Sequence, residues 1–388
     1  MKKKKIFLFT GSRADYGILF SLIKKIYNNS KIQLRIIICG QHYSSYYGNT
    51  FKEIKKDFPN IIIGTKIMIK SSNSKKIVNY ISQEVEKINL IINKEKPDMN
   101  VLLGDRYEIF SAAIASYYNN IKIAHLHGGE VTHGSLDDSI RHSISKLSDI
   151  HFVCHTQYKK RLVQMGESPK NIFNYGSLGV ERLVKEKKIS REKLVKKFKL
   201  NKDKKIFLIT FNAYQYDEIH PIKIVKNLLN IFDSLNNVQF IFSLSNSDNY
   251  SDEINRYIIN FCKNNKDARY FKSLGFRYYS SLMKISDLII GNSSSGIIEA
   301  PKFNLPVINI GNRQKGRVLM KNIFSVSGDF SSLKRSIINI LKKKNKNFKS
   351  KNEFYKNNTT NKIYAKIIEN IKVKKKNKKF LDINYWNA

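Results

Sequence analysis

The feature that most constrains the fold is an alternation of short apolar runs with longer stretches of helical character. In the first half, apolar runs lie at residues 6–10, 34–39, 99–103, 121–125, 151–154 and 172–175. The segments between them, for example 75–93, carry apolar residues at helical spacing. Because parallel strands need crossover connections, usually helices, this alternation predicts a parallel, doubly wound sheet in an α/β protein.

The alternation stops at a strongly charged stretch, residues 182–204, and begins again with an apolar run at 206–210. A chain of 388 residues is also too long for one ordinary core. We therefore predict two Rossmann-like domains facing each other across a cleft, at residues 1–182 and 183–345. A basic tail, 346–388, follows them, with one helix near 361–371. Ligands of such sheets bind beyond the carboxyl ends of the strands, so the strand-end loops are where chemistry is expected.

The net charge of +39 suggests a nucleic-acid partner at first sight. The lysines, however, are spread along the chain, with local concentrations at 2–5, 342–346 and 372–379. No Arg-rich helix, zinc-finger spacing or aromatic RNA-binding strand accompanies them. We expect solvated lysine faces and no specific nucleic-acid partner.

The cysteines and the apolar runs bear on the compartment. Cys39, Cys154 and Cys262 are far apart and odd in number, so they indicate neither a disulfide framework nor a metal site. No apolar run approaches the roughly 20 residues of a membrane helix. The apolar part of residues 1–17 is too short for a signal peptide and is interpreted as a first strand. These patterns predict a cytoplasmic protein without a membrane partner.

Two strand-end loops of the first half carry candidate binding and acid/base groups. Residues 11–17, GSRADYG, predict a turn into a helix start, where backbone amides attract an anion and Arg13 can clamp a phosphate. Residues 104–108, GDRYE, place Asp105 directly after a buried strand, which suits proton transfer. The alternatives are a capped turn with a surface arginine and Asp105 as an ordinary helix cap.

The densest loop spans residues 125–142. It contains the carboxylates and histidines His125, His127, Glu130, His133, Asp137, Asp138 and His142. Asp137 and Arg141 are four apart and share a helix face. A zinc site is the competing interpretation, but HLH lacks the His-x-x-x-His spacing of a helical site and the Gly128–Gly129 pair suits a sugar pocket better. We expect no metal, and we expect His125 and His142 to serve packing or capping.

In the second half, residues 291–296, GNSSSG, lead from a strand into a helix. Such a Gly/Ser loop offers free amides and hydroxyls to a diphosphate at the positive end of the helix. Glu299 can accept hydrogen bonds from a ribose diol, and the basic loop at 311–317 can close over the phosphates.

Four blocks of sequence, 11–17, 104–116, 125–148 and 291–317, resemble the hydrolysing UDP-N-acetylglucosamine 2-epimerases of nonulosonic (sialic-type) acid synthesis. The resemblance covers about residues 4–317. It implies the glycosyltransferase-B architecture, with substrate between the two domains and a C-terminal helix returning to the first. It also implies cleavage to UDP and N-acetylmannosamine through a 2-acetamidoglucal, without metal or redox cofactor, by a homodimer or homotetramer.

The resemblance also implies roles for single residues. The acid/base candidates are Asp105, Glu130 and Asp137 or its neighbour Asp138, and Arg141 orders the carboxylates. The groups expected to bind the UDP-sugar are Arg13, Gly17, Arg106, Asn212, Asn246, Ser293, Ser294, Glu299 and Arg313.

One position departs from the family pattern. After the first strand of the second domain the family has Phe-His-Pro-Val-Thr, whereas this chain has Phe211-Asn212-Ala213-Tyr214-Gln215. Asn212 can exchange hydrogen bonds but cannot carry a proton or a charge. His220 lies eight residues later and would need a shifted loop to replace the family histidine.

The alternatives therefore stay open. One is the same reaction on UDP- or GDP-linked N,N'-diacetylbacillosamine, in the legionaminic acid route. The others are a glycosyltransferase of the same architecture and a non-catalytic nucleotide-sugar or nucleic-acid binder.

Overall fold

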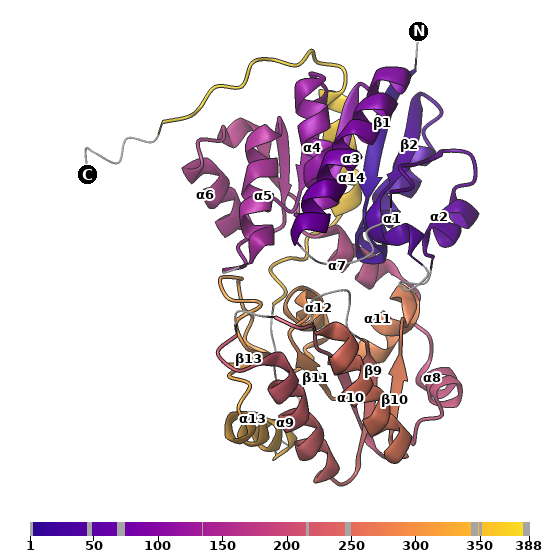
Figure 1. Cartoon of the computed structure of the whole chain (residues 1–388), viewed down its shortest axis with the longest axis vertical. Helices are drawn as coiled ribbons and strands as arrows, with labels where there is room; N and C mark the ends of the chain where they lie inside the picture. Colours follow the sequence, from indigo (N-terminus) through magenta and orange to yellow (C-terminus); the bar gives the residue numbers. More distant parts are fainter. Residues whose placement is uncertain are drawn as a thin grey trace. The chain divides into compact units, whose positions relative to one another are not determined.

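The structure is a computed structural model, and it describes residues 3–44, 49–67, 74–133, 135–214, 217–244, 250–342, 348 and 351–382. The chain divides into two compact units (Figure 1). The first comprises Met1–Glu130, Ser135–Arg182 and Glu353–Ala388, and the second comprises Val131–Gly134 and Leu183–Asn352.

The first unit is built on a parallel sheet that, in the described residues, has seven strands in the order β3-β2-β1-β4-β5-β6-β7. These strands are β1 (Lys4–Thr10), β2 (Ile32–Ile38), β3 (Ile62–Gly64), β4 (Met99–Leu103), β5 (Lys122–Leu126), β6 (Ile150–Val153) and β7 (Ile172–Asn174). The helical elements are α1 (Arg13–Tyr27), η1 (Gly40–Tyr43), α2 (Phe51–Asp57), α3 (Ser74–Glu95), α4 (Tyr107–Tyr118), α5 (Leu136–Leu147), α6 (Thr156–Gln164), η2 (Pro169–Asn171), α7 (Leu178–Lys185) and α14 (Thr359–Asn370).

Side chains of successive strand residues point to opposite faces of this sheet, and each face has its own core. In β1, Ile6 and Leu8 belong to one apolar cluster, together with residues of α1 and α14. Phe7 and Phe9 belong to the other, together with residues of α3 and α4. All four side chains are fully buried, so residues 6–9 of β1 are apolar without interruption, as expected for a strand covered by helices on both faces.

The second unit repeats the same plan. In the described residues its parallel sheet has six strands in the order β10-β9-β8-β11-β12-β13. They are β8 (Lys205–Thr210), β9 (Val238–Ser243), β10 (Ala268–Phe271), β11 (Leu288–Gly291), β12 (Val307–Ile310) and β13 (Ile323–Val326). The helical elements are α8 (Arg191–Phe198), α9 (Pro221–Asp233), α10 (Ser251–Asn264), α11 (Gly275–Ile285), α12 (Ser294–Ile298), η3 (Ala300–Phe303) and α13 (Phe330–Lys342).

Both sheets have the strand order of a Rossmann fold, in which the direction of winding reverses beside the first strand. The reversal lies between β1 and β4 in the first unit and between β8 and β11 in the second. Ligands of doubly wound sheets bind at the carboxyl ends of the strands flanking this point. We therefore expect ligands to bind at the loops that follow β1, β4, β8 and β11.

The C-terminal part of the chain returns to the first unit. Ile363 and Ile367 of α14 are buried in the same cluster as residues of α1. Beyond α14 an extended segment, drawn in yellow in Figure 1, is fastened by lysine ammonium groups that donate to backbone carbonyls. Lys122 donates to Asn370 and Val373 at 2.8 and 2.7 Å, Lys375 to Ile121 at 3.0 Å, and Lys378 to Lys146 and Ser148 at 2.8 Å each.

Among the described residues, none of the helices combines the length and the apolar character that crossing a membrane requires.

Candidate active site

The loops after β4 and β5 are fixed to each other by a buried histidine. The ring of His125 donates from Nε2 to the Gly104 carbonyl at 2.8 Å, and its Nδ1 lies 3.1 Å from the Ser145 hydroxyl. Burial lowers the pKa of His125 to about 3, so the ring is neutral and its role is structural, as the sequence predicted. This contact positions the backbone directly before Asp105. The other histidine expected to pack, His142, is partly exposed, with Nε2 3.6 Å from Asp138 Oδ2.

Arg141 joins the predicted carboxylates of the first unit. It projects from α5, its side chain is 2% exposed, and it forms an ion pair with Asp105. Its Nη1 also donates to Asp138 Oδ1 at 3.1 Å and to the Glu130 carbonyl at 3.0 Å. The planar guanidinium fork can serve several acceptors at once, which a lysine cannot do. Arg141 thereby holds the carboxylates of Asp105 and Asp138 together with the backbone of Glu130, whereas the side chain of Asp137 is exposed.

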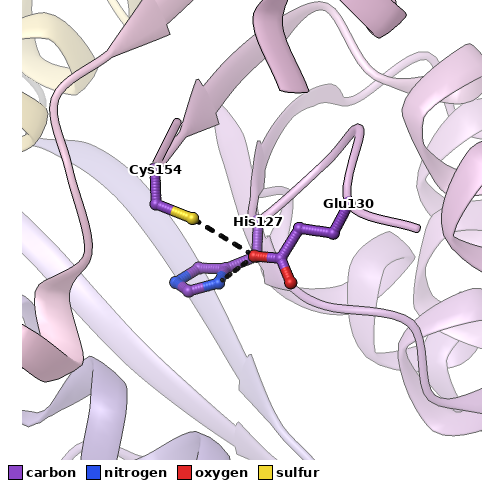
Figure 2. A group of neighbouring side chains, drawn as sticks. All are labelled: His127, Glu130 and Cys154. Atoms are coloured by element: carbon purple, nitrogen blue, oxygen red, sulfur yellow. Dashed lines mark hydrogen bonds and ion pairs between the residues drawn. The ribbon is translucent and has the colours of Figure 1, made fainter. Parts of the chain in front are cut away.

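Glu130 lies at the centre of a second group (Figure 2). Its Oε1 accepts a hydrogen bond from His127 Nδ1 at 2.7 Å and one from the Cys154 thiol at 3.3 Å. Glu130 is 3% exposed and Cys154 1%. Cys154 directly follows β6, which pairs with β5, so the sheet brings it beside Glu130 although 24 residues separate the two.

The loop that carries Glu130 has an unusual backbone. His127 has a φ of 65° and Gly129 a φ of 73°, both in the left-handed region. A side chain at Gly129 would place a Cβ 2.4 Å from the Tyr158 carbonyl, so only glycine fits there. The Gly129 carbonyl accepts from Arg161 at 2.5 Å. Strained backbone of this kind persists where surrounding contacts hold it, and it is common at functional sites.

Arg106, expected to bind UDP, makes a two-pronged ion pair with the fully buried Glu108, at 3.0 and 3.1 Å. Burial raises the pKa of Glu108, and the Arg106 charge opposes that rise. Gly40, after β2, has a φ of 54°, and a Cβ there would lie 2.2 Å from Glu108 Oε1. The carboxylate thus needs a glycine opposite it, and Glu108 orients Arg106 at the carboxyl end of the sheet.

The loop after β1 forms a capped helix start. The Ser12 hydroxyl accepts a hydrogen bond from the Asp15 amide, and α1 begins at Arg13. Arg13 is partly exposed in the first turn, and burial lowers its pKa while Glu53 opposes the shift. Gly17 lies within α1, and its carbonyl accepts from Arg182 at 2.5 Å.

In the second unit, the loops after β8 and β11 are joined through an amide side chain. Asn292 accepts from the Asn212 amide and donates to the Asn212 carbonyl, both at 2.8 Å. Both residues are buried. The backbone of Asn212 is therefore held by Asn292, in the loop where the predicted nucleotide site begins. Asn212 is the position that departs from the family pattern.

The serine loop forms the start of α12. Ser293 is its N-cap and accepts from the Ser295 amide at 3.4 Å, and Tyr279 lies 2.7 Å from the Ser295 hydroxyl. Ser294 is the first helical residue and is partly exposed. Glu299 is the C-cap of α12, because the helix ends at Ile298.

The basic loop after β12 contacts the same serine loop. Arg313 and Gln314 donate to the Asn292 carbonyl at 3.0 and 2.8 Å. Lys315 contacts the short segment that follows Glu130, since its carbonyl accepts from the His133 amide at 3.0 Å. Asn246, also expected in the nucleotide site, lies outside the described residues.

The chain is similar to known proteins over most of its length. A sequence model of the UDP-N-acetylglucosamine 2-epimerase family matches residues 24–368. The chain belongs to this family. One relative, the GDP/UDP-N,N'-diacetylbacillosamine 2-epimerase (hydrolyzing) of Campylobacter jejuni, is 42% identical over 83% of this chain and 84% of its own. Another, the polysialic acid biosynthesis protein P7 of Escherichia coli, is 37% identical over 86% and 85%.

Solved structures of 2-epimerases have the same fold as this chain. The UDP-GlcNAc 2-epimerase of Neisseria meningitidis, solved with bound UDP-GlcNAc, superposes with a TM-score of 0.80 at 17% identity, over 94% of this chain and 100% of its own. The architecture is that of two Rossmann-like domains of glycosyltransferase-B type, with a C-terminal helix on the first. Together with the named relatives, membership makes the chain an enzyme of the hydrolysing nucleotide-sugar 2-epimerase type.

Sequence reasoning missed three residues of this site. His127 was noted only as a doubtful metal ligand, Glu108 as part of a motif without a role, and Cys154 as an isolated thiol. The signal for Cys154 is its place at the end of the apolar run 151–154, since Asp105 and Glu130 also lie where such runs end or in the loops that follow them.

Proposed function

We propose that this 2-epimerase converts a UDP-linked 2-acetamido sugar and water into UDP and the free 2-epimer, with UDP-N-acetylglucosamine and N-acetylmannosamine as substrate and product. The observation that carries the proposal is the single guanidinium of Arg141, which brings Asp105, Asp138 and the backbone of Glu130 together at the carboxyl ends of β4 and β5.

The reaction needs acid/base groups on both sides of one sugar ring. In the first step the C1–O bond to UDP breaks while a carboxylate takes the proton from C2, which leaves a C1=C2 double bond, the 2-acetamidoglucal. In the second step water adds its hydroxyl to C1, and a carboxyl group returns a proton to C2 from the other face. Two carboxyl groups therefore suffice, and we assign these roles to Asp105 and Glu130.

The departing diphosphate needs positive or hydrogen-bonding groups. We propose that the serine loop at Ser293 and Ser294 binds it through amides and hydroxyls at the start of α12, with Arg313 beside them. Arg13 and Arg106 are proposed to add positive charge from the first unit.

A second substrate has its own support. The relative that is named for GDP/UDP-N,N'-diacetylbacillosamine is 42% identical to this chain. The relative that is named for polysialic acid biosynthesis is less similar, at 37% identity. Asn212 in place of the family histidine also leaves the second unit without a proton carrier at that position. UDP- or GDP-linked N,N'-diacetylbacillosamine is therefore the second candidate, with the same bonds broken and formed.

The test incubates the pure protein with each nucleotide sugar in D₂O and follows the reaction by proton NMR. Release of free nucleotide with a manno-configured sugar carrying deuterium at C2 is the expected result for the true substrate. Release of the sugar without inversion at C2, or no turnover of any candidate, would contradict the proposal.

The same assay tests the acid/base roles. Asp105→Asn and Glu130→Gln should each lower kcat at least about 100-fold, because an amide cannot move a proton. Asp98→Asn is the matched control. Asp98 pairs with Lys4 at 2.7 Å at the amino end of the sheet, so its loss should leave kcat within about twofold. Near-normal rates for Asp105→Asn would reduce that residue to a structural role.

We further propose that the enzyme acts in the cytoplasm as a homodimer or homotetramer. The family resemblance supports the assembly, and the three free cysteines are consistent with a reducing compartment. Light scattering on the eluting peak of a size-exclusion column measures the assembly directly.

A further inference from the structure

His127, Glu130 and Cys154, here called the His–Glu–Cys trio, have the donor set of a transition-metal site. Their ligand atoms, Nδ1, Oε1 and Sγ, all lie within 4.8 Å of one another. Within the described residues this is the only such group of three or more. We propose that the trio is an inhibitory Zn²⁺ site, in which the ion binds all three side chains and withdraws Glu130 from proton transfer.

The chemistry of the ligands selects the ion. One imidazole nitrogen, one thiolate sulfur and one carboxylate oxygen suit Zn²⁺ or Co²⁺, whereas Mg²⁺ and Ca²⁺ prefer oxygen ligands alone. Three protein ligands leave a fourth position for water, as in open zinc sites. His127 is the most exposed of the three, at 13%, so solvent reaches the group from its side.

The distances need only a small adjustment. Around tetrahedral zinc, neighbouring ligand atoms lie about 3.3–3.7 Å apart. In the structure Nδ1 and Sγ are 2.7 and 3.3 Å from Glu130 Oε1, because a proton bridges each contact (Figure 2). Replacing the two bridging protons by one ion requires shifts of about half an ångström at these two contacts, and Nδ1 and Sγ, which lie within 4.8 Å of each other, must approach to about 3.5 Å. The thiol proton leaves to solvent, and the imidazole proton moves from Nδ1 to Nε2, which frees Nδ1 to bind the ion.

The trio is held in place by contacts that do not involve an ion. The His127 amide donates to the Phe152 carbonyl at 2.9 Å, and Arg141 holds the Glu130 carbonyl at 3.0 Å. The positive charge of Arg141 does not exclude a cation, since Asp105 and Asp138 pair with that guanidinium. The ligands are therefore preorganised, which lowers the cost of binding an ion.

Binding is tested without substrate, on the metal-free full-length protein, with Co²⁺ as the probe. We expect one Co²⁺ per chain, with the visible bands of a four-coordinate ion and a near-ultraviolet thiolate charge-transfer band, both displaced by Zn²⁺. Cys154→Ser should abolish the charge-transfer band and weaken Zn²⁺ binding at least about 10-fold. Cys262→Ser, a free cysteine of the second unit, is the matched control and should change neither.

The absence of the charge-transfer band in the unmodified protein, or its survival in Cys154→Ser, overturns the site. If circular dichroism shows that Cys154→Ser does not fold, His127→Gln takes its place, and it should weaken Co²⁺ binding by a similar factor.

The inhibitory effect rests on the proposed function and has a separate readout. Zn²⁺ should suppress epimerisation, and a chelator should restore it. In Cys154→Ser, with inhibition measured relative to the variant's own rate without Zn²⁺, the Zn²⁺ concentration for half inhibition should rise at least about 10-fold. Co²⁺ binding by a protein that turns over no nucleotide sugar would confirm the site and refute the proposed function. Binding with undiminished turnover would confirm the site and refute its inhibitory effect.

Discussion

Arg141→Lys tests whether one buried guanidinium organises the acid/base groups. Arg141 makes three charge-assisted hydrogen bonds, to Asp105, Asp138 and the Glu130 carbonyl. Lysine keeps the charge but cannot reproduce the fork, so about two of these bonds are lost. Bonds to charged groups contribute about 1.5–3 kcal/mol each. The lower value applies here, because Asp105 and Asp138 are 24% and 22% exposed. The expected destabilisation is about 3 kcal/mol.

The same change should slow catalysis. A misplacement of about 1 Å in a catalytic group can cost about 100-fold in rate, and we expect a fall of that size in kcat. Thermal unfolding should shift down by about 6–12 °C, at about 2–4 °C per kcal/mol. The measurements are differential scanning calorimetry and the NMR assay on the same preparation.

Arg35→Lys is the control for this prediction. Arg35 pairs with Glu95 at 3.7 Å and lies in β2, outside the carboxyl-end loops. Its replacement should cost less than about 1 kcal/mol and leave kcat within about twofold. If Arg141→Lys loses stability but keeps normal kcat, Arg141 stabilises the fold without organising catalysis. If Arg141→Lys loses neither stability nor kcat, the lysine ammonium replaces the hydrogen bonds of the guanidinium.

Two further predictions concern stability. Burial raises the pKa of Glu167, but hydrogen bonds from His151 and two lysines outweigh this and lower it to about 2. The ionised Glu167 carboxylate therefore stabilises the fold fully above its unfolded pKa, near 4.5, and this stabilisation is lost as the pH falls toward 2. Glu167→Gln should lower the free energy of unfolding by about 3 kcal/mol at about pH 7. At about pH 3.5 the loss should be about 1 kcal/mol smaller. Urea unfolding at both values measures this, and a pH-independent cost contradicts it. Gly40→Ala places a Cβ against Glu108 and also puts alanine in a left-handed backbone conformation, so it should lower the free energy of unfolding by about 2–4 kcal/mol. Gly104→Ala is the control, because its backbone is also left-handed but its added Cβ meets nothing within 4 Å. It should lower the free energy of unfolding by about 1 kcal/mol. Equal unfolding free energies for the two variants would exclude the clash.

The central strands could be predicted from the sequence, and so could the edge strand β7, but the other edge strands of the described residues could not. Strands such as β1 and β4 are mostly apolar because helices cover both faces of the sheet. The undetected strands β3, β10 and β13 lie at the outer edges of the sheets, where strands are short and only half-buried. A short half-buried strand has too few apolar residues to show a period.

The candidate site follows the same division. Asp105 and Glu130 were predicted because each follows a buried run, and this rule needs no knowledge of which strands pair. The contact of Glu130 with Cys154 depends on β6 lying beside β5, and the ion pair of Arg106 with Glu108 depends on the space left by Gly40. Both are properties of the assembled sheet, which the spacing of residues along the chain does not express.

The lysines that fasten the C-terminal segment have a practical consequence for charge engineering. Replacing lysines is a common way to lower a high net charge, here +39, and a composition count treats every lysine as equal. Lys122, Lys375 and Lys378 have a structural role, because their hydrogen bonds to backbone carbonyls hold the C-terminal segment on the first unit. Acetylating or replacing them would remove those donors and release the segment from the first unit, so a charge-reduced variant should keep these three and take its substitutions elsewhere.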